Sequence, residues 1–387
     1  SSDVCSSDLA RDVGQRQLAL GRLRMFEREG ADHRKQEIDE QPRADRDADL
    51  QPVAVHPGGA DIPVVAEILE RVGCCGWRLG GQDHAPGNVA QEPGLTMRSL
   101  LFVPGDSEKK LAKGFASEAD VVIVDLEDSV APANKAAARE VASGFIMAQR
   151  HTTRAAVYVR VNDLSTGLTD DDLRAVVKAA PDGIMLPKSN NGQDVQHLAT
   201  KLRVHEAEAG LREGGIRILP LITETAAGVL AAGTYAGMSD RLVGVTWGAE
   251  DLSAAIGAHA ARDENGVYTD VFRLARALTL LAASSAQVAA IDTVFPNFRN
   301  MPAFEAECRD AVRDGFTGKM AIHPDQVPVI NAIFTPSPES VAKSQAIVDA
   351  FTAAGNPGVV GIDGKMYDRP HLRLAERILA QASAAAR

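Results

Sequence analysis

Eight short apolar runs follow Met97, and nearly every one ends on a charged or turn-forming residue. Stretches with a helical pattern separate most of these runs. A run that is apolar throughout indicates a strand buried on both faces, as in a parallel sheet covered by helices. Eight strand–helix units close naturally into a parallel barrel, whose active site lies at the carboxyl ends of the strands. The pattern therefore predicts both a fold and the position of a site.

The expected elements alternate along the chain. The predicted strands are 99–103, 121–124, 156–161, 183–186, 217–222, 242–247, 289–291 and 320–322. The main predicted helices are 107–117, 134–149, 170–180, 195–209, 226–236, 272–287 and 301–314. A doubly wound open sheet is the alternative architecture, but eight units and the lack of a GxGxxG motif favour a (β/α)8 TIM barrel.

The composition narrows the range of partners. The chain carries a formal net charge of −11, and only 4% of its residues are aromatic. Such a surface does not attract phosphate backbones or acidic lipids, and few rings are available to stack on bases. No apolar run reaches the roughly 20 residues that span a bilayer, and the amino terminus lacks the pattern of a signal peptide. We therefore expect a cytoplasmic protein with no nucleic-acid or membrane partner.

Residues 1–96 differ in composition from the rest of the chain. They contain ten Arg but a single Lys, and they have few sustained periodic runs. Ser1–Leu9 repeats the letters SSD and resembles translated sequencing-adapter DNA. We interpret 1–96 as a non-native or disordered extension, with Met97 as the true start, and we assign it no function.

The four cysteines form no recognisable metal or disulfide pattern. Cys5, Cys74 and Cys75 lie in the first 96 residues, whereas Cys308 lies alone in a helix-like stretch. We expect Cys308 to be a buried thiol rather than a nucleophile, so redox chemistry and structural zinc are not predicted.

Acidic residues follow several of the predicted strands. They are Asp125, Glu127, Asp128, Glu224, Glu250, Asp251 and Asp292. A single carboxylate after a strand often only caps the next helix, but a closed barrel gathers the whole set onto one face. Such a group either repels itself or holds a cation. Hard ions such as Mg²⁺ favour one or two carboxylates together with substrate oxygens and water.

Positive and donor groups follow other strands on the same face, namely Arg160, Lys188 and His323. Together with the acids they suit a metal-bound substrate that carries a carboxylate. For His323 we expect a structural or peripheral binding role before a role in proton transfer.

Nine motifs in this order resemble the HpcH/HpaI aldolase and citrate lyase family. They are RSLLFVPGD, VIVDLEDSVAP, YVRVN, GIMLPK, ITET, GVTWGAEDL, AIDTV, GFTGKMAIHPDQ and DGKMYDRP. Within the family they are most similar to the CoA-ester lyases related to the citrate lyase β subunit. The resemblance covers essentially all of 97–387 and none of 1–96.

The resemblance implies a catalytic TIM barrel over 97–335 and a C-terminal helical lid over 336–387. It also implies Mg²⁺ as the cofactor and a homo-oligomer, a trimer or hexamer. In that assembly each lid reaches into the site of a neighbouring subunit.

The family resemblance also implies roles for individual residues. Glu224 of ITET and Asp251 of GAEDL match the metal ligands. Arg160 of YVRVN matches the residue that binds the substrate and steadies its developing oxyanion, and Asp368 of GKMYDRP matches the catalytic carboxylate of the lid. The remaining residues expected at the substrate are Asp125, Glu127, Asp128 and Lys188.

The resemblance implies cleavage of a short 3-hydroxyacyl-CoA, of the malyl-, citramalyl- or citryl-CoA type, to acetyl-CoA and a 2-keto acid. Three alternatives stay open. The chain could be a citrate lyase β subunit that receives its thioester from an acyl carrier, a malyl-CoA thioesterase, or a CoA-binding scaffold. The identity of the keto acid does not follow from the sequence.

Overall fold

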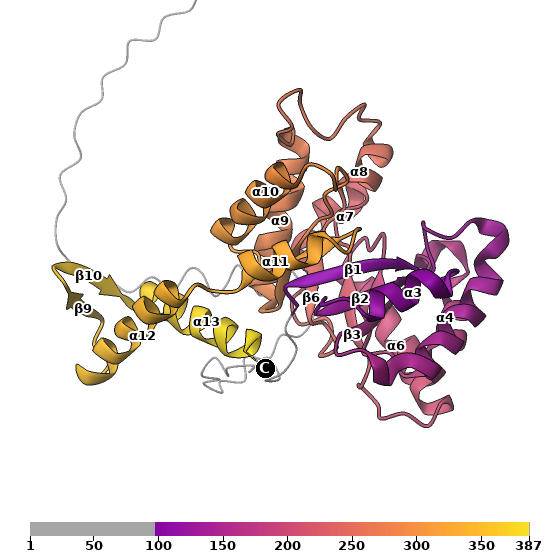
Figure 1. Ribbon diagram of the computed structural model, residues 1–387, viewed down its shortest axis with the longest axis horizontal. Helices are drawn as coiled ribbons and strands as arrows, with labels where there is room; N and C mark the ends of the chain where they lie inside the picture. Colours follow the sequence, from indigo (N-terminus) through magenta and orange to yellow (C-terminus); the bar gives the residue numbers. More distant parts are fainter. Residues whose placement is uncertain (1–96, 387) are drawn as a thin grey trace, which may run out of the picture. The chain divides into compact units, whose positions relative to one another are not determined.

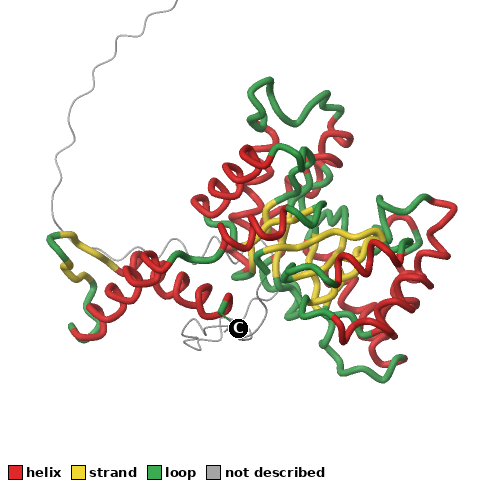
Figure 2. The backbone as a smooth tube through the Cα atoms, in the orientation of Figure 1, coloured by secondary structure: helices red, strands yellow, loops and turns green. Residues whose placement is uncertain are grey.

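The computed structural model describes residues 97–386. Its centre is a ring of eight parallel strands, with helices around it (Figures 1 and 2). The strands are β1 Ser99–Pro104, β2 Val121–Asp125, β3 Ala156–Arg160, β4 Gly183–Leu186, β5 Arg217–Pro220, β6 Gly244–Thr246, β7 Ala289–Asp292 and β8 Gly318–Ala321. The interpretation of residues 1–96 lies outside the described residues.

The strands follow the order β5-β4-β3-β2-β1-β8-β7-β6. Two isolated parallel bridges, Ile218↔Leu242 and Leu221↔Thr246, join β5 to β6 and close the ring. The predicted (β/α)8 barrel is therefore confirmed, and an open doubly wound sheet is excluded. Because all eight strands run the same way, their carboxyl ends meet on one face, which we call the rim.

Helices connect successive strands, and α11 Gln326–Phe334 follows the last strand of the ring. The connecting helices are α3 Glu108–Phe115, α4 Lys135–Gln149, α5 Thr169–Val176, α6 Gly192–Glu208, α7 Ala226–Leu230, α8 Ala249–Ile256, α9 Asp270–Ala286 and α10 Met301–Asp314. The helix expected over 226–236 is shorter, since a separate 3-10 turn forms at Ala232–Tyr235. The helix expected over 170–180 likewise ends in a 3-10 turn.

Helix α10 illustrates how the sequence sets these boundaries. The side chain of Asn300 accepts a hydrogen bond from the Ala303 N–H at the start of the helix, and a proline follows in the first turn. Gly315 ends the helix at a φ of 112°, which only glycine adopts without strain. The helix therefore begins and ends where its capping residues require.

Side chains alternate between two cores along each strand. One core packs the strands against the helices, and the other fills the barrel interior with residues such as Leu100, Ile123, Tyr158 and Met320. A Cβ atom on Gly183 would lie 2.2 Å from the Tyr158 ring, so glycine is required there. The barrel interior is therefore packed with side chains.

The C-terminal segment has a hydrophobic cluster of its own. It contains α12 Pro338–Ala353, the antiparallel strands β9 Val359–Ile362 and β10 Lys365–Asp368, and α13 Arg369–Ala385. Phe351 and Leu372 belong to the small core that these elements share. The helices agree with the expected helical segment, whereas the hairpin was not predicted. None of the helices in the described part of the chain is long and apolar enough to cross a membrane.

Candidate active site at the barrel rim

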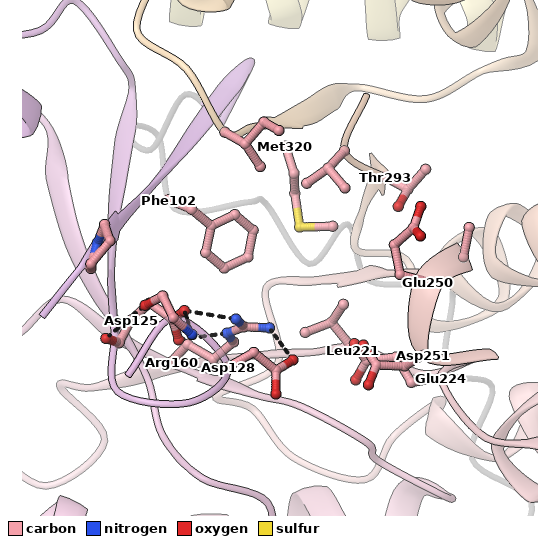
Figure 3. A pocket seen from close by; sticks show the side chains of 16 residues that line it. Phe102, Asp125, Asp128, Arg160, Leu221, Glu224, Glu250, Asp251, Thr293 and Met320 are labelled. Carbon is pink, nitrogen blue, oxygen red and sulfur yellow. Dashed lines mark hydrogen bonds and ion pairs between the residues drawn. The ribbon is translucent and has the colours of Figure 1, made fainter. Parts of the chain in front are cut away.

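A cavity of about 400 Å³ opens at the rim (Figure 3). Its apolar lining comes from Phe102, Leu221, Val294, Met320 and Ile322. Its charged lining comes from Asp125, Asp128, Arg160, Glu224, Glu250 and Asp251. The cavity can therefore accept a small ligand that has both a hydrocarbon portion and oxygen atoms.

Arg160 ends strand β3 directly opposite Asp125, which ends the neighbouring strand β2. Its guanidinium donates two hydrogen bonds to Asp125, Nε to Oδ1 at 2.8 Å and Nη2 to Oδ2 at 2.7 Å. The third nitrogen, Nη1, lies 2.9 Å from Oε2 of Glu127, and the group lies over the Phe102 ring. Burial, the largest single influence, would raise the pKa of Asp125, but the hydrogen bonds and the charge of Arg160, with the contacts from Ser129 and the Glu127 N–H, together lower that pKa. Arg160 is thus held by two carboxylates and a ring.

Lys188 follows strand β4 and joins the two sides of the charged lining. Its ammonium contacts Glu127 Oε1 and lies 3.1 Å from Asp251 Oδ1. Its backbone N–H donates a 2.6 Å hydrogen bond to Oε2 of Glu224. Asp128 is more exposed and lies 3.8 Å from both the Lys188 ammonium and Nη1 of Arg160. We call the seven residues of this network the rim cluster: Asp125, Glu127, Asp128, Arg160, Lys188, Glu224 and Asp251.

Glu224 is the most deeply buried carboxylate on the Asp251 side of the cavity, at 2% exposed. Burial and the nearby Asp251 carboxylate raise its pKa to about 8, although the Lys188 N–H opposes this shift. Figure 3 shows Glu224 and Asp251 next to each other on the same side of the cavity. The two acids therefore interact unfavourably unless a proton or a cation lies between them.

Local backbone geometry brings this pair together. Thr225 caps helix α7 directly after Glu224, through a 2.9 Å hydrogen bond from the Gly228 N–H. Asp251 lies in the first turn of α8, which follows Gly248. A Cβ on Gly248 would lie 2.8 Å from Cγ of Glu224, so a larger residue would push the two loops apart.

The charge balance of the rim cluster favours a divalent cation. Five carboxyl groups face two cationic side chains, an excess of 5 − 2 = 3 acids. Among the described residues no group of three or more His, Cys, Asp or Glu is arranged to hold a metal. Mg²⁺ does not need one, since it commonly takes one or two carboxylates and completes its shell with water and substrate. Glu224 and Asp251 fit that requirement.

Two residues expected at the rim, Asp292 and His323, do not line the cavity. The expectation that Asp292 joins the rim acids is wrong: it is fully buried and bonds Trp247 Nε1 at 2.8 Å and Lys319 Nζ at 3.0 Å. His323 stacks on Phe298, with ring centroids 4.6 Å apart, and is partly exposed. Its contacts leave the structural or peripheral role in place as a prediction.

Asp368 does not line the cavity. It is exposed and caps helix α13, with its Oδ1 atom 2.5 Å from Nδ1 of His371. The hydrogen bond from His371 lowers the pKa of Asp368. A catalytic role for this carboxylate therefore requires contact with the cavity of another subunit, and it stays a prediction.

Two cavity residues escaped the sequence reasoning. The Phe102 ring lies beneath Arg160, 4.8 Å from its guanidinium carbon. Thr293 is 1% exposed, and its hydroxyl has no hydrogen-bond partner among the described residues. Strand alternation was the available signal for Thr293, since a residue next to an outward-facing Asp292 faces the barrel interior.

The family model for the HpcH/HpaI aldolase/citrate lyase family matches residues 98–324. The chain belongs to this family. That assignment confirms the predicted membership and the expectation of an enzyme of the aldolase and lyase type. The match covers all eight strands and ends in the loop between β8 and α11.

Similar proteins include enzymes with two reaction types. The chain is 32% identical to citramalyl-CoA lyase from Rattus norvegicus, over 74% of this chain and 86% of the relative. It is 33% identical to (3S)-malyl-CoA thioesterase from Cereibacter sphaeroides, over 75% and 95%. A crystal structure of CitE from Mycobacterium tuberculosis, in complex with magnesium, acetoacetate and coenzyme A, superposes with a TM-score of 0.59. It is 34% identical and covers 74% of this chain and 98% of its own.

Proposed function

We propose that this chain is a Mg²⁺-dependent carbon–carbon lyase that cleaves a short 3-hydroxyacyl-CoA to acetyl-CoA and a 2-keto acid. The observation that carries the proposal is the buried Glu224 and its neighbour Asp251, which share one cavity with Arg160. The activity named for the rat relative and the ligands of the mycobacterial structure support it. The carboxylate, hydroxyl and thioester of such a substrate suit the mixed lining of the cavity.

Glu224 and Asp251 are the residues that would hold the ion. When bound, Mg²⁺ supplies a Lewis acid that polarises the substrate's hydroxyl and carboxylate oxygens. The Lys188 N–H fixes one oxygen of Glu224 and leaves the other available. Asp125 and Glu127 likewise hold Arg160 in place, because their contacts define the plane of its guanidinium.

Cleavage transfers the hydroxyl proton to a base, which we assign to the Asp368 carboxylate of a neighbouring chain. It also breaks the adjacent carbon–carbon bond, so that the electron pair moves to the thioester as an enolate. Arg160 is the residue that stabilises the enolate oxygen. Its guanidinium has five N–H groups, and two of them donate to Asp125, which leaves 5 − 2 = 3, including those on Nη1 beside Glu127, for a substrate. A permanently charged, fixed donor is well suited to a developing oxyanion.

The enolate carbon then takes up a proton to give acetyl-CoA. We assign this step to Asp368, delivered by residues 336–387 of a neighbouring chain to a barrel formed by 97–335. To act, the carboxyl group has to exchange its His371 contact for the neighbour's cavity, where exclusion of water would raise its pKa. This arrangement requires an oligomer, for which we propose a trimer or hexamer, and light scattering on the purified full chain tests it directly.

The apolar lining is where the size of the keto acid would be selected. Glyoxylate and pyruvate differ by one methyl group, a difference worth about 1–3 kcal/mol in an apolar pocket. Leu221, Met320 and Ile322 supply hydrocarbon surface to this cavity. Short substrates with an unbranched or methylated carbinol carbon are therefore the ones to test first.

The test is a panel of malyl-, citramalyl- and citryl-CoA, assayed with Mg²⁺ and again with EDTA. Both products are measured. A lyase releases acetyl-CoA and glyoxylate, pyruvate or oxaloacetate in equal amounts, and EDTA stops the reaction. Failure of every thioester to give a keto acid would sink the proposal.

The similarity to a malyl-CoA thioesterase favours a second candidate function. Water would then attack the thioester carbonyl, and the products would be free CoA and the intact hydroxy acid. The same panel separates the two reactions, because only hydrolysis releases a free thiol without a keto acid.

The family description also includes citrate lyase, which supports a third candidate, a β subunit that acts on a citryl thioester of an acyl-carrier protein. Such a subunit would leave all free CoA esters uncleaved and would turn over only the carrier-bound thioester. An assay with a citryl-acyl-carrier protein distinguishes it from a stand-alone lyase.

A further inference from the structure

Lys188 contacts both carboxylates of the proposed metal pair. Its backbone N–H donates to Glu224 Oε2 at 2.6 Å, and its ammonium lies 3.1 Å from Asp251 Oδ1. The ammonium also contacts Glu127. A cationic group therefore already lies against one of the two oxygen donors on which a metal ion would depend.

The loop that carries Lys188 is firmly placed. The Ser189 N–H donates to the Leu221 carbonyl at 3.1 Å, and the buried Tyr235 hydroxyl donates to the Ser189 carbonyl at 3.1 Å. Lys188 itself has a φ of +50°, a left-handed conformation that glycine adopts more readily than other residues. The chain nevertheless has a lysine at this position, whose side chain is the cation of the Glu127 and Asp251 contacts.

A bound divalent cation and this ammonium would repel each other at such short range, because the group is only 28% exposed and solvent screens it weakly. The Glu127 contact offers the ammonium an alternative partner that does not depend on Asp251.

We propose that Lys188 is an internal counter-ion that competes with the divalent cation for Asp251. In the cation-free protein its ammonium neutralises Asp251 while its N–H holds Glu224 in place. Cation binding releases the ammonium from Asp251 to Glu127 and the cavity, where it is available to the substrate carboxylate. This inference rests on the proposed function for the identity of Glu224 and Asp251 as metal ligands.

Mn²⁺ binding to the substrate-free full chain tests the competition, with free Mn²⁺ measured by its electron paramagnetic resonance signal at one fixed pH. Lys188→Met removes the charge, and Lys188→Gly removes it while suiting the left-handed backbone and keeping the N–H. We expect both variants to bind Mn²⁺ at least about tenfold more tightly than the parent chain, as the loss of a nearby like charge requires. Lys201→Met is the matched control, since Lys201 pairs with the exposed Asp170 on the surface.

A second readout is thermal stability. In EDTA the Lys188→Met chain should unfold at a lower temperature than the parent, because Asp251 and Glu127 lose their counter-ion, and saturating Mg²⁺ should remove most of the difference. If Lys188→Met does not fold, Lys188→Gly gives the same comparison with the backbone satisfied.

Unchanged or weaker Mn²⁺ affinity in the folded Lys188 variants overturns the inference while leaving the proposed function intact. The proposed metal site fails instead if the parent chain binds no Mn²⁺, or if Glu224→Gln binds Mn²⁺ as tightly as the parent chain does. The two failures are therefore distinguishable in one titration series.

Discussion

Two groups of buried charges lie on different surfaces of the same barrel wall. Five of the seven residues of the rim cluster line the cavity, and Glu127 and Lys188, which contact them, do not. The outer cluster, comprising Arg262, Arg276, Asp292, Glu307, Asp314 and Lys319, lies between strands β7 and β8 and helices α9 and α10. In the outer cluster Lys319 Nζ lies 3.0 Å from Asp292 and 2.9 Å from Glu307, and Arg276 bridges Asp292 and Asp314.

The two clusters differ in charge balance. The outer cluster pairs three acids with three cations, whereas the rim cluster has five acids and two cations. Burial acts on Asp292 as it does on Glu224, yet the neighbouring Lys319 and Arg276 lower the pKa of Asp292. Glu224 has an acid beside it, and its pKa rises to about 8. A balanced, closed group supports the fold, and an unbalanced group beside a cavity is prepared for a ligand.

The largest effect is expected in the outer cluster. Lys319→Met leaves Asp292 and Glu307 buried without their shared cation, which should lower the free energy of unfolding by about 3–5 kcal/mol. Urea titration with EDTA and with Mg²⁺ measures this loss, which should be the same in both. A loss below about 1 kcal/mol, or a loss that Mg²⁺ reverses, would contradict the assignment of the outer cluster as a group that stabilises the fold without a metal ion.

In the rim cluster, Arg160→Gln should lower kcat by about 10²–10³, the usual cost of removing one hydrogen-bond donor to an oxyanion. Arg160→Lys is the matched variant: it keeps the charge but cannot reproduce the two-pronged contact with Asp125. We expect it to lose most of the same activity. Arg160→Lys with nearly full kcat would show that charge alone matters and that the fixed plane does not.

Asp368→Asn should reduce turnover about a hundredfold, at the low end for a general acid. Asparagine caps helices as well as aspartate does, so the melting temperature should stay the same. Asp368→Ala should in addition lose about 1 kcal/mol of stability, because the helix cap disappears. Unimpaired turnover by Asp368→Asn would remove the C-terminal segment from the reaction.

Protonation provides a further test of the contrast. Without a cation Glu224 should be mostly protonated at neutral pH and should ionise as the pH rises through about 8. The metal-free chain should accordingly lose stability as the pH rises from the ordinary glutamate value of 4.5 through 8. Infrared spectroscopy of the protonated carboxyl group, with Glu224→Gln as reference, follows this single proton. Addition of Mg²⁺ should remove the band, and a band that persists would contradict the assignment of Glu224 as a ligand.

The smallest effect is expected at Cys308, which is fully buried beside the outer cluster. Burial raises the pKa of its thiol to about 12, so that very little thiolate exists at pH 8. Iodoacetamide should therefore leave Cys308 unmodified in the folded protein, and modification should increase only toward strongly alkaline pH. Peptide mapping distinguishes it from the other cysteines. Rapid alkylation at pH 8 would show that this side of the barrel opens.

Most of the barrel could be predicted from the sequence because its strands are buried on both faces and therefore read as apolar runs. The hairpin of β9 and β10 could not be predicted in this way. Its strands are partly exposed, as at Val359 and Met366, so they do not require a continuous apolar run in the sequence. The Asp363-Gly364 pair at its turn was the available signal, and both residues have positive φ angles.

The positions of the acids after the predicted strands indicated that the site lies at the rim. Which residues line the cavity depends on the direction in which each side chain points. Asp292 and Thr293 are adjacent, and only Thr293 lines the cavity. The link from the Lys188 N–H to Glu224 depends on a left-handed backbone that the letters Pro-Lys-Ser do not encode. Contacts that depend on such a conformation can be identified only from the three-dimensional structure.

Anomalous scattering from crystals soaked in Mn²⁺ tests the contrast between the two clusters most directly. One strong peak is expected in the cavity, within bonding distance of carboxylate oxygens of both Glu224 and Asp251, and it should vanish in Asp251→Asn. A peak at Asp292 in the outer cluster, or none in the cavity at saturating Mn²⁺, would contradict the assignment of the rim cluster as the metal-dependent site.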